Sequence, residues 1–370
     1  MNGIFADLGA QIEHAWSRTG YDDEAFPTIC AAHFETCKPW TGFSLRETLA
    51  AVRDDPQLAG IQFQSNFGDL QVVVFRNWHF YIEILFWAQG VTSIHDHAFA
   101  GAFCMLHGES VHTQYAFRNV RPVNSRFLFG DMGVTGCENL KVGDIRRIAP
   151  GSTFIHATFH LPQPSVSLVA RTYATTRYQP QLDYHPPHVA LDTSNTDLAA
   201  TKMLQSLQMS HLVDQPLAEA GMLRWFRDGT AEEVYWLLRS QLWMRSDAPA
   251  RRDMMAAVLE RPFGRDLIRT IQFGQVRDRV IELRGRCQDT GLRRLLGVLV
   301  TCPDRAALLA FFGAAAMPPA ELARQLLAIH AMASPAAGGA DLDEIIAWLD
   351  SGETPKIFDT SPIFRHIFLG

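Results

Sequence analysis

His95 and His97 are the first residues of this sequence whose types and spacing could bind a metal ion. They stand one residue apart in TSIHDHAFAGAFCMLHGES (92–110), just before a run of small and apolar residues. On a strand both side chains leave the same face, so two imidazoles can meet one metal ion, whereas on a helix they would diverge. With 14 histidines in 370 residues, an H-x-H pair is expected by chance about half the time. The pair therefore needs a third ligand.

A third histidine is offered by a later segment, GDIRRIAPGSTFIHATFH (143–160), in which His156 follows the Pro150–Gly151 turn. Together the two segments resemble the paired motifs of the cupin superfamily, H-x-H in the first and G-(x)5-P-x-G-(x)2-H in the second. The second motif is rearranged here, because Gly151 follows the proline directly and His156 lies five residues after that glycine. The resemblance implies a β-barrel that holds a metal ion through His95, His97 and His156.

The position at which most cupins carry a glutamate ligand is occupied here by Gly101 or Ala102. A triad of histidines without that glutamate is similar to the one in the thiol dioxygenases, the cupin family that includes cysteine dioxygenase. FRNWHFYIEILFWAQGVTSIHDH (75–97) looks like the family's Arg-Asn segment, Trp-ending strand and S-I-H-D-H, and QPSVSLVARTY (163–173) is similar to its P-x-V-S-L strand. This resemblance spans residues 75–173. It implies Fe(II) as the metal, O2 as co-substrate and a sulfinate product made from a thiol.

Three neutral imidazoles suit this chemistry. They leave the full charge of Fe(II) and several coordination positions available, in contrast to an arrangement of two histidines and one carboxylate. The charge on the metal lowers the pKa of a thiol, so that a thiolate can bind directly while O2 takes a neighbouring position. Imidazoles also bind Zn, Cu and Ni, so the metal identity stays open at this point.

Three residues near the triad are candidates for contacts with the substrate. By the resemblance, Arg76 grips a substrate carboxylate through its planar fork of donors and Trp87 lines the pocket. A surface arginine at a strand end and an ordinary core aromatic are the alternatives. His160 lies four residues after His156, on the same face of a strand, and is a candidate catalytic residue in place of the histidine that the family carries elsewhere.

The family's Ser-x-His-x-Tyr series falls on Ser167, Val169 and Arg171, so only the serine is retained and is a candidate catalytic residue. Alternation along a strand places Ser167, Arg171 and Tyr173 on one face. There Arg171 is a candidate for binding an anionic substrate group, with pairing to an internal acid such as Glu83 as the alternative. Tyr173 is a further candidate for substrate binding. The altered series favours a thiol that is larger than cysteine or differently charged.

The secondary-structure elements that must position these residues are predicted from the pattern of residue types along the sequence. Residues 59–178 contain short β-branched and aromatic runs between turn residues and predict an antiparallel β-barrel of the cupin, or double-stranded β-helix, type. Residues 1–58 are predicted to form helices that pack on the barrel, and 179–197 a proline-rich linker. Residues 198–370 are predicted to form an all-helical domain, because their apolar residues recur at spacings of three and four.

The composition limits which classes of binding partner and which cellular compartment we expect. The net charge is −6 and charged residues make up 19% of the chain, which argues against nucleic acid as a partner. The sequence lacks a secretory signal and an apolar run long enough for a bilayer, so we expect a cytoplasmic protein with no membrane partner. The six cysteines show no C-x-x-C pairing and are expected to be reduced: Cys30, Cys37, Cys104, Cys137, Cys287 and Cys302. The helical region is a candidate for covering the barrel, forming a homodimer or holding a protein partner.

These features predict a non-haem Fe(II) dioxygenase of the thiol dioxygenase type that acts on a small anionic thiol. Two alternatives remain open. One is a cupin metalloenzyme with a non-thiol substrate, either an isomerase or a dioxygenase that cleaves a C–C bond. The other is a cupin without catalytic activity that senses a ligand and signals through the helical region.

Overall fold

The computed structural model describes residues 2–63, 67–88, 91–194, 197–301, 304–314, 317–334, 341–356, 358, 361 and 363–364. Three residues named or quoted above lie outside this set, namely Gln89 and Gly90 of the segment 75–97 and Cys302. Contacts divide the chain into two compact units. The first comprises Met1–Ala116, Val134–Gln181 and Asp278–Gly370, and the second comprises Phe117–Gly133 and Leu182–Arg277. The predicted helical domain, 198–370, is therefore divided between the two units.

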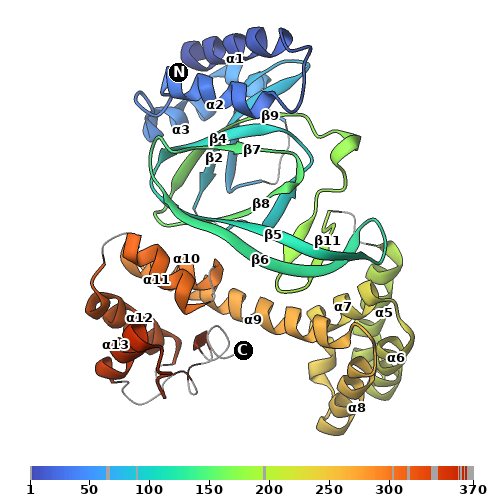
Figure 1. Ribbon diagram of the computed structural model, residues 1–370. Helices are drawn as coiled ribbons and strands as arrows, with labels where there is room; N and C mark the ends of the chain where they lie inside the picture. The colour runs from blue at the N-terminus through green and yellow to red at the C-terminus, as the bar shows by residue number, and fades with distance from the viewer. Residues whose placement is uncertain are drawn as a thin grey trace. The chain divides into compact units, whose positions relative to one another are not determined.

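The N-terminal region of the first unit is helical, as predicted, and covers one face of a five-stranded sheet (Figure 1). Its helices are α1 (Asn2–Ser17), α2 (Phe26–Cys37), α3 (Leu45–Asp54) and α4 (Pro56–Gly60). Ser44 caps α3 by accepting a hydrogen bond from the N–H of Glu47, which satisfies one of the donors left open at a helix start.

The five-stranded sheet has the order β1-β2-β9-β4-β7, and all its described pairs are antiparallel. Its strands are β1 (Leu70–Arg76), β2 (Phe80–Trp87), β4 (Gly101–His107), β7 (Ile145–Ile148) and β9 (Ser165–Thr172). Strand β2 is buried on both faces. Its alternate residues Phe80, Ile82 and Ile84 pack against the N-terminal helices, whereas Glu83 and Trp87 face a cavity on the other side. This double burial explains why the strand is apolar at almost every position, with Glu83 as the exception.

The second set of strands forms a closed antiparallel barrel in the order β10-β11-β6-β5-β8-β3, which confirms the predicted fold class. Its strands are β3 (Ile94–His97), β5 (Ser110–Pro122), β6 (Phe127–Leu140), β8 (Gly151–His160), β10 (Asp183–His185) and β11 (Val189–Leu191). The segment predicted as a linker, 179–197, thus contributes two short strands. Each has three residues, too few to show a period of two among the prolines.

The remaining helices belong partly to each unit. They are α5 (Leu198–Val213), α6 (Gln215–Asp228), α7 (Ala231–Ser240), α8 (Ala248–Leu259), α9 (Gly264–Arg286), α10 (Thr290–Thr301), α11 (Arg305–Ala314), α12 (Pro319–Ala333) and α13 (Leu342–Ser351), with short 3₁₀ turns at Thr176–Tyr178 and Leu242–Arg245. In the first unit, α10 packs on strand β8. The Cβ of a residue in place of Gly297 would lie 2.8 Å from the ring of Phe159, so glycine permits this close approach.

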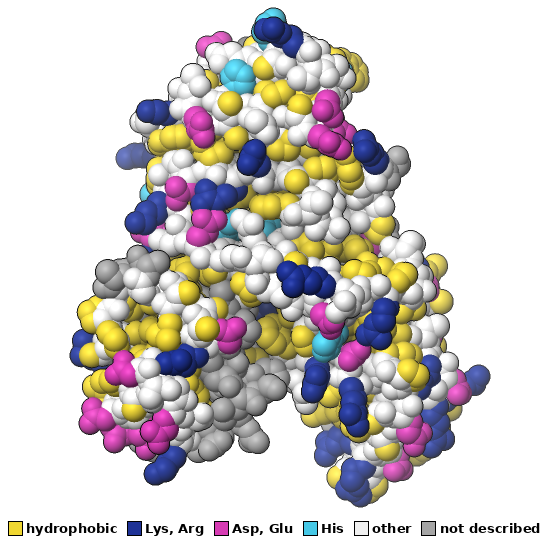
Figure 2. Space-filling view, in the orientation of Figure 1, with side chains coloured by type: hydrophobic (Ala, Val, Ile, Leu, Met, Phe, Trp, Pro, Cys, Tyr) yellow, Lys and Arg dark blue, Asp and Glu magenta, His cyan; other side chains and the backbone are white. Residues whose placement is uncertain are grey.

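None of the helices in the described part of the chain combines the length and apolar character needed to cross a bilayer. On the face drawn in Figure 2, acidic and basic side chains are interspersed with apolar ones.

Candidate metal centre

The three predicted ligands meet because β3 pairs with β8. His95 lies opposite His156, and His97 lies opposite Gly151 with a bulge between the two pairs. The ring centroids of His95 and His97 are 4.7 Å apart, and each is 4.9 Å from that of His156. One ligand atom from each ring lies within 4.8 Å of the others, and all three side chains are buried. The structure thus brings together the residues that the H-x-H and downstream segments suggested.

Each of the three rings has a hydrogen bond, and the one to His95 fixes the position of its proton. Nδ1 of His95 is 2.9 Å from the carbonyl oxygen of Ser93, which can only accept, so this nitrogen carries the proton and Nε2 carries the lone pair. Nδ1 of His156 is 2.9 Å from Nε2 of His112. His97 is hydrogen-bonded to the backbone of Phe154, and its buried Nδ1 has no hydrogen-bond partner in the described part of the chain.

The electrostatic setting favours neutral imidazoles. Burial lowers the pKa of His97 and His156 well below the usual value, and repulsion between the protonated forms of neighbouring rings lowers both further. Only a neutral imidazole has a lone pair for a metal ion. His97 and His156 are therefore ready to bind a divalent metal at neutral pH without first losing protons.

The chemistry of this donor set fits a divalent transition metal. Three imidazoles are borderline donors that suit Fe, Zn, Cu and Ni, and the buried Nδ1 of His97 is a polar atom that a metal ion would satisfy. A fourth ligand at the usual cupin position is excluded on steric grounds. A Cβ at Gly101 would lie 2.4 Å from the carbonyl oxygen of Ala170, and the neighbouring Ala102 belongs to the core beneath the N-terminal helices.

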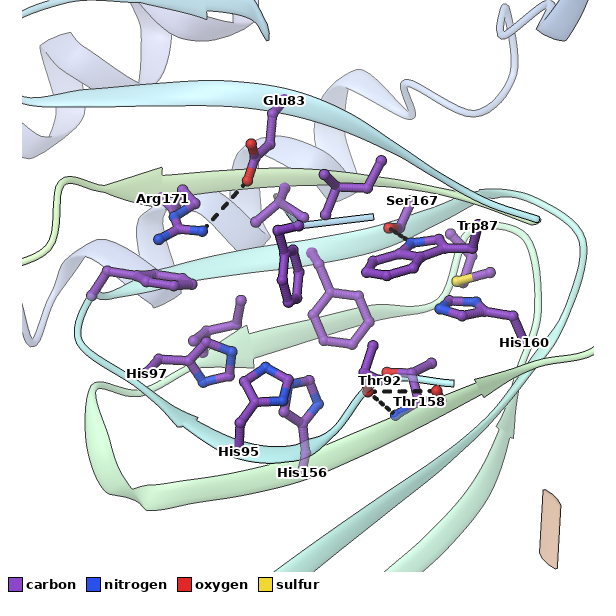
Figure 3. Close-up of a pocket in the computed structure, with 17 residues that line it drawn as sticks. Glu83, Trp87, Thr92, His95, His97, His156, Thr158, His160, Ser167 and Arg171 are labelled. Atoms are coloured by element: carbon purple, nitrogen blue, oxygen red, sulfur yellow. Dashed lines mark hydrogen bonds and ion pairs between the residues drawn. The ribbon is translucent and has the colours of Figure 1, made fainter. Parts of the chain in front are cut away.

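The histidines line a cavity between the two sets of strands, most of whose other walls are apolar (Figure 3). At one end Arg171 lies 3.6 Å from Glu83, measured from Nη1 to Oε1, and its guanidinium covers the ring of Phe99 at 3.3 Å. The pairing with Glu83 is the alternative that the sequence left open. Burial raises the pKa of Glu83, while the charge of Arg171 opposes that shift. Nε of Arg171 and Oε1 of Glu83 have no hydrogen-bond partner among the described residues.

At the other end of the cavity lie Trp87, Ser167 and His160 (Figure 3). The indole N–H of Trp87 donates to the hydroxyl of Ser167 at 3.2 Å. His160 stacks on Trp87 with ring centroids 4.7 Å apart, and its Nδ1 lies 2.8 Å and 2.7 Å from the hydroxyls of Ser110 and Ser165. Burial lowers the pKa of His160 to about 3. Its Nε2 is buried without a partner in the described part of the chain.

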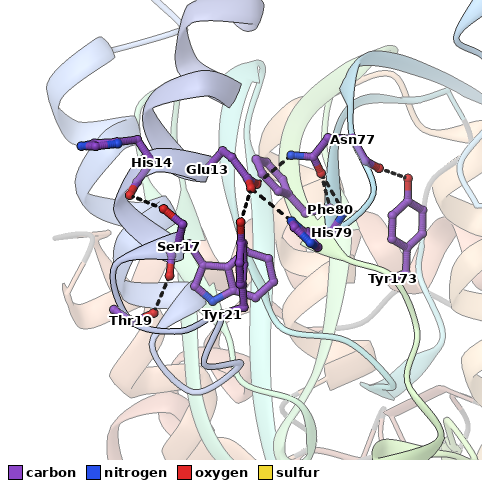
Figure 4. Close-up of polar contacts among 10 residues, drawn as sticks. Glu13, His14, Ser17, Thr19, Tyr21, Asn77, His79, Phe80 and Tyr173 are labelled. Atoms are coloured by element: carbon purple, nitrogen blue, oxygen red, sulfur yellow. Dashed lines mark hydrogen bonds and ion pairs between the residues drawn. The ribbon is translucent and has the colours of Figure 1, made fainter.

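Two predicted substrate contacts lie outside this cavity. Arg76 is exposed at the end of β1, and Tyr173 follows the last residue of β9 with 39% of its surface exposed. The hydroxyl of Tyr173 donates to the carbonyl oxygen of Asn77 at 2.8 Å (Figure 4). Asn77 in turn donates to Glu13 of α1 at 2.7 Å, so this tyrosine joins a polar cluster that ties the N-terminal helix to the β1–β2 turn. Strand alternation stops with the strand, which is why Tyr173 does not continue the face of Arg171.

The sequence reasoning missed His112 and Glu138. His112 is not among the predicted site residues, yet it contacts His156 and is fully buried. Partial burial alone would raise the pKa of Glu138, but hydrogen bonds from His112 and Arg146 lower it to about 2. The first four residues of β5, SVHT, are buried although three of them are polar, and only the pairing of β5 with β8 places the histidine among them beside His156.

Comparisons with known proteins give weak structural similarities. No protein-family model and no curated protein sequence matches the chain. Hydroquinone 1,2-dioxygenase from Sphingomonas sp. TTNP3 matches 29% of this chain and 68% of its own, with 14% identity and a TM-score of 0.23. The DMSP lyase DddQ from Ruegeria pomeroyi DSS-3 matches 50% and 98%, with 14% identity and a TM-score of 0.27. A Klebsiella pneumoniae protein with a double-stranded β-helix domain matches 36% and 87%, with 17% identity and a TM-score of 0.21. Similarities this weak support neither a family assignment nor an activity.

Proposed function

We propose that this protein is a non-haem Fe(II)-dependent dioxygenase that adds both atoms of O2 to the sulfur of a small anionic thiol. The observation that carries the proposal is the buried metal-binding group. Among the described residues it consists of three histidines and contains no Asp or Glu. The overall reaction balances as RS⁻ + O2 → RSO2⁻. Sulfur loses four electrons, O2 gains four, and both oxygen atoms remain on sulfur.

An Fe(II) ion held by His95, His97 and His156 would supply the positive charge that favours a thiolate and the coordination positions at which sulfur and O2 meet. The protein's own part is to keep the imidazoles of His97 and His156 neutral and to surround the site with apolar side chains that exclude water. Such walls include Phe99, Phe103 and Ile148. In a site with little water, the electrostatic interactions of the remaining polar groups are strong.

Arg171 is proposed to bind the anionic group of the substrate. Its Nε is a buried donor without a hydrogen-bond partner among the described residues, and such a donor costs about 1–3 kcal/mol of stability. A carboxylate or sulfonate would satisfy this donor, while Glu83 and the ring of Phe99 hold the guanidinium in place. An anionic thiol with its charge at one end and its sulfur at the other would then span the cavity from Arg171 to the histidines.

His160 is proposed to orient the substrate by a hydrogen bond from its Nε2. The hydroxyls of Ser110 and Ser165 lie next to Nδ1, and a neutral imidazole that accepts at Nδ1 carries its proton on Nε2. Ser167 acts through Trp87, since it accepts the indole N–H and so fixes the ring on which His160 stacks.

The test combines metal analysis with oxygen uptake. Protein purified without oxygen is expected to hold one Fe(II) per chain, and His97→Ala is expected to abolish metal binding. Oxygen uptake should depend on an added thiol and should give a sulfinate in which both oxygen atoms come from ¹⁸O2. Arg171→Met should raise KM for carboxylated thiols more than for uncharged ones, whereas Arg147→Met, at an exposed arginine on β7, should not.

Other outcomes would point to the alternatives. Stoichiometric metal without thiol-dependent oxygen uptake would favour a metalloenzyme with a non-thiol substrate. Wild-type protein that binds no metal under any loading condition would contradict catalysis of this kind and favour a ligand sensor.

A further inference from the structure

We propose that His112 and Glu138 form a hydrogen-bonded chain that orients His156 and strengthens its Nε2 as a metal ligand. The two residues thereby determine how tightly the three histidines hold a metal ion. They touch neither the metal position nor the cavity, so they are positioning residues. The inference rests on the metal centre of the proposed function.

The hydrogen-bonded chain crosses three strands of the barrel. Nε2 of His112, on β5, is 2.9 Å from Nδ1 of His156, on β8. Nδ1 of His112 is 3.0 Å from Oε1 of Glu138, on β6. In the β5–β8 register, His112 lies opposite Thr158 and His156 lies opposite Gln114. The two histidines are therefore diagonal neighbours on one face, which long side chains can bridge.

The direction of each hydrogen bond follows from its acceptor. An ionised carboxylate can only accept, so Nδ1 of His112 carries a proton and donates it to Glu138. The other nitrogen of a neutral His112 then accepts, which places the proton of His156 on Nδ1. Nε2 of His156 is left with the lone pair. The chain thus selects the tautomer of His156 that can bind a metal ion.

Arg146 holds the outer end of the chain in its charged form. Its Nε donates to Oε1 of Glu138 at 2.7 Å, and a second nitrogen of the same guanidinium contacts Oε2. A bidentate arginine keeps the carboxylate ionised and fixes its plane. A negative charge behind a ligating histidine, transmitted through hydrogen bonds, makes that histidine a stronger donor to the metal.

The surroundings of His112 leave these two hydrogen bonds to set its orientation. The side chain is fully buried. The rings of Phe103 and Phe154 lie next to it, with centroids 5.8 Å and 6.1 Å from that of His112. Neither ring accepts a conventional hydrogen bond.

The test measures Co(II) affinity of the full-length protein stripped of metal, by competition with a chelator. His112→Leu removes the acceptor, whereas His112→Gln places an amide oxygen near the position of Nε2. We expect Co(II) to bind about 10- to 100-fold more weakly to His112→Leu. His112→Gln should restore most of the affinity, and Glu138→Gln should give an intermediate loss. His107→Leu, at an exposed histidine on β4, is the control for the loss of an imidazole elsewhere.

A folded His112→Leu variant with wild-type affinity would overturn the inference and leave the metal centre intact. Equal losses in His112→Leu and His112→Gln would also overturn it, because any change of packing would then have the same effect. If His112→Leu does not fold, Glu138→Gln, at a partly exposed position, provides the test. Unchanged Co(II) affinity in Glu138→Gln would then refute the proposed role of the hydrogen-bonded chain. Wild-type protein that binds no Co(II) would instead remove the metal centre itself, and with it this inference.

Discussion

Replacing Arg171 with methionine removes one partner of the buried pair with Glu83, and its cost can be worked from the structure. Glu83 has 1% of its side chain exposed and Arg171 has 17%, and their charged atoms are 3.6 Å apart. Removing one partner of such a pair leaves a buried charge and costs about 3–5 kcal/mol of unfolding free energy. We therefore expect Arg171→Met to be strongly destabilised at pH 8.

The penalty should depend on pH in a defined direction. Burial raises the pKa of Glu83 even with Arg171 present, and the loss of the arginine removes the opposing charge. A folded-state pKa above the unfolded one stabilises the fold at low pH, and this stability is lost as the pH rises through the folded value. Above the unfolded pKa, the variant should lose about 1.4 kcal/mol per pH unit until the folded pKa is reached.

Urea unfolding of the variant and the wild type at pH 5 and pH 8 measures this directly. The double variant Glu83→Gln, Arg171→Met carries no charge at either of these two positions and should recover most of the stability at pH 8. A penalty below about 1 kcal/mol at pH 8, or one that is the same at both pH values, would refute a buried pair. Arg171 would then be a solvated residue, and its proposed contact with the substrate would lose its structural basis.

Three further predictions concern packing and charge. Gly101→Ala should cost about 3 kcal/mol or more of unfolding free energy, because its Cβ would meet a backbone carbonyl of β9 that cannot turn aside; an unchanged urea midpoint would contradict this. Gly297→Ala should lose stability against the ring of Phe159, whereas Gly274→Ala, which meets nothing within 4 Å, should gain about 1 kcal/mol from helix propensity; thermal unfolding compares the two. The folded pKa of Glu138 is about 2, below its unfolded value, so its contribution to stability is present above about pH 4.5 and is lost toward pH 2. With 36% of its side chain exposed, that contribution is about 1 kcal/mol, and the stability gap between wild type and Glu138→Gln should narrow from pH 5 to pH 3.

Local patterns in the sequence predicted the helices and strands better than they predicted which strands pair with each other. The apolar runs predicted the barrel, and an H-x-H pair on a strand predicted that two rings would share a face, as His95 and His97 do. The sequence offers no prediction for His112, because the mixed polar and apolar residues around it in β5 carry no local signal of the residue that it contacts on another strand. Its position opposite Thr158 follows from strand pairing between residues more than forty positions apart. Strand β10, with three residues, was missed because so short a strand has no periodicity of its own.

The rearranged second motif still delivers its histidine because strand pairing, rather than distance from the turn, fixes the position of His156. In a regular antiparallel ladder, the step of two positions from His95 to His97 would be matched by a step of two positions on β8. Here the partners, His156 and Gly151, are five apart, and the extra residues are accommodated by a bulge. Gly151 begins β8 with a φ of +69°, a conformation that favours glycine, so the strand can start directly after the proline. Beyond the bulge, β8 pairs with β5 through Tyr115 and its neighbours, and a slip of one residue there would turn His156 away from the cavity. The irregular spacing is therefore compatible with a three-histidine site, provided that the β5–β8 register is kept.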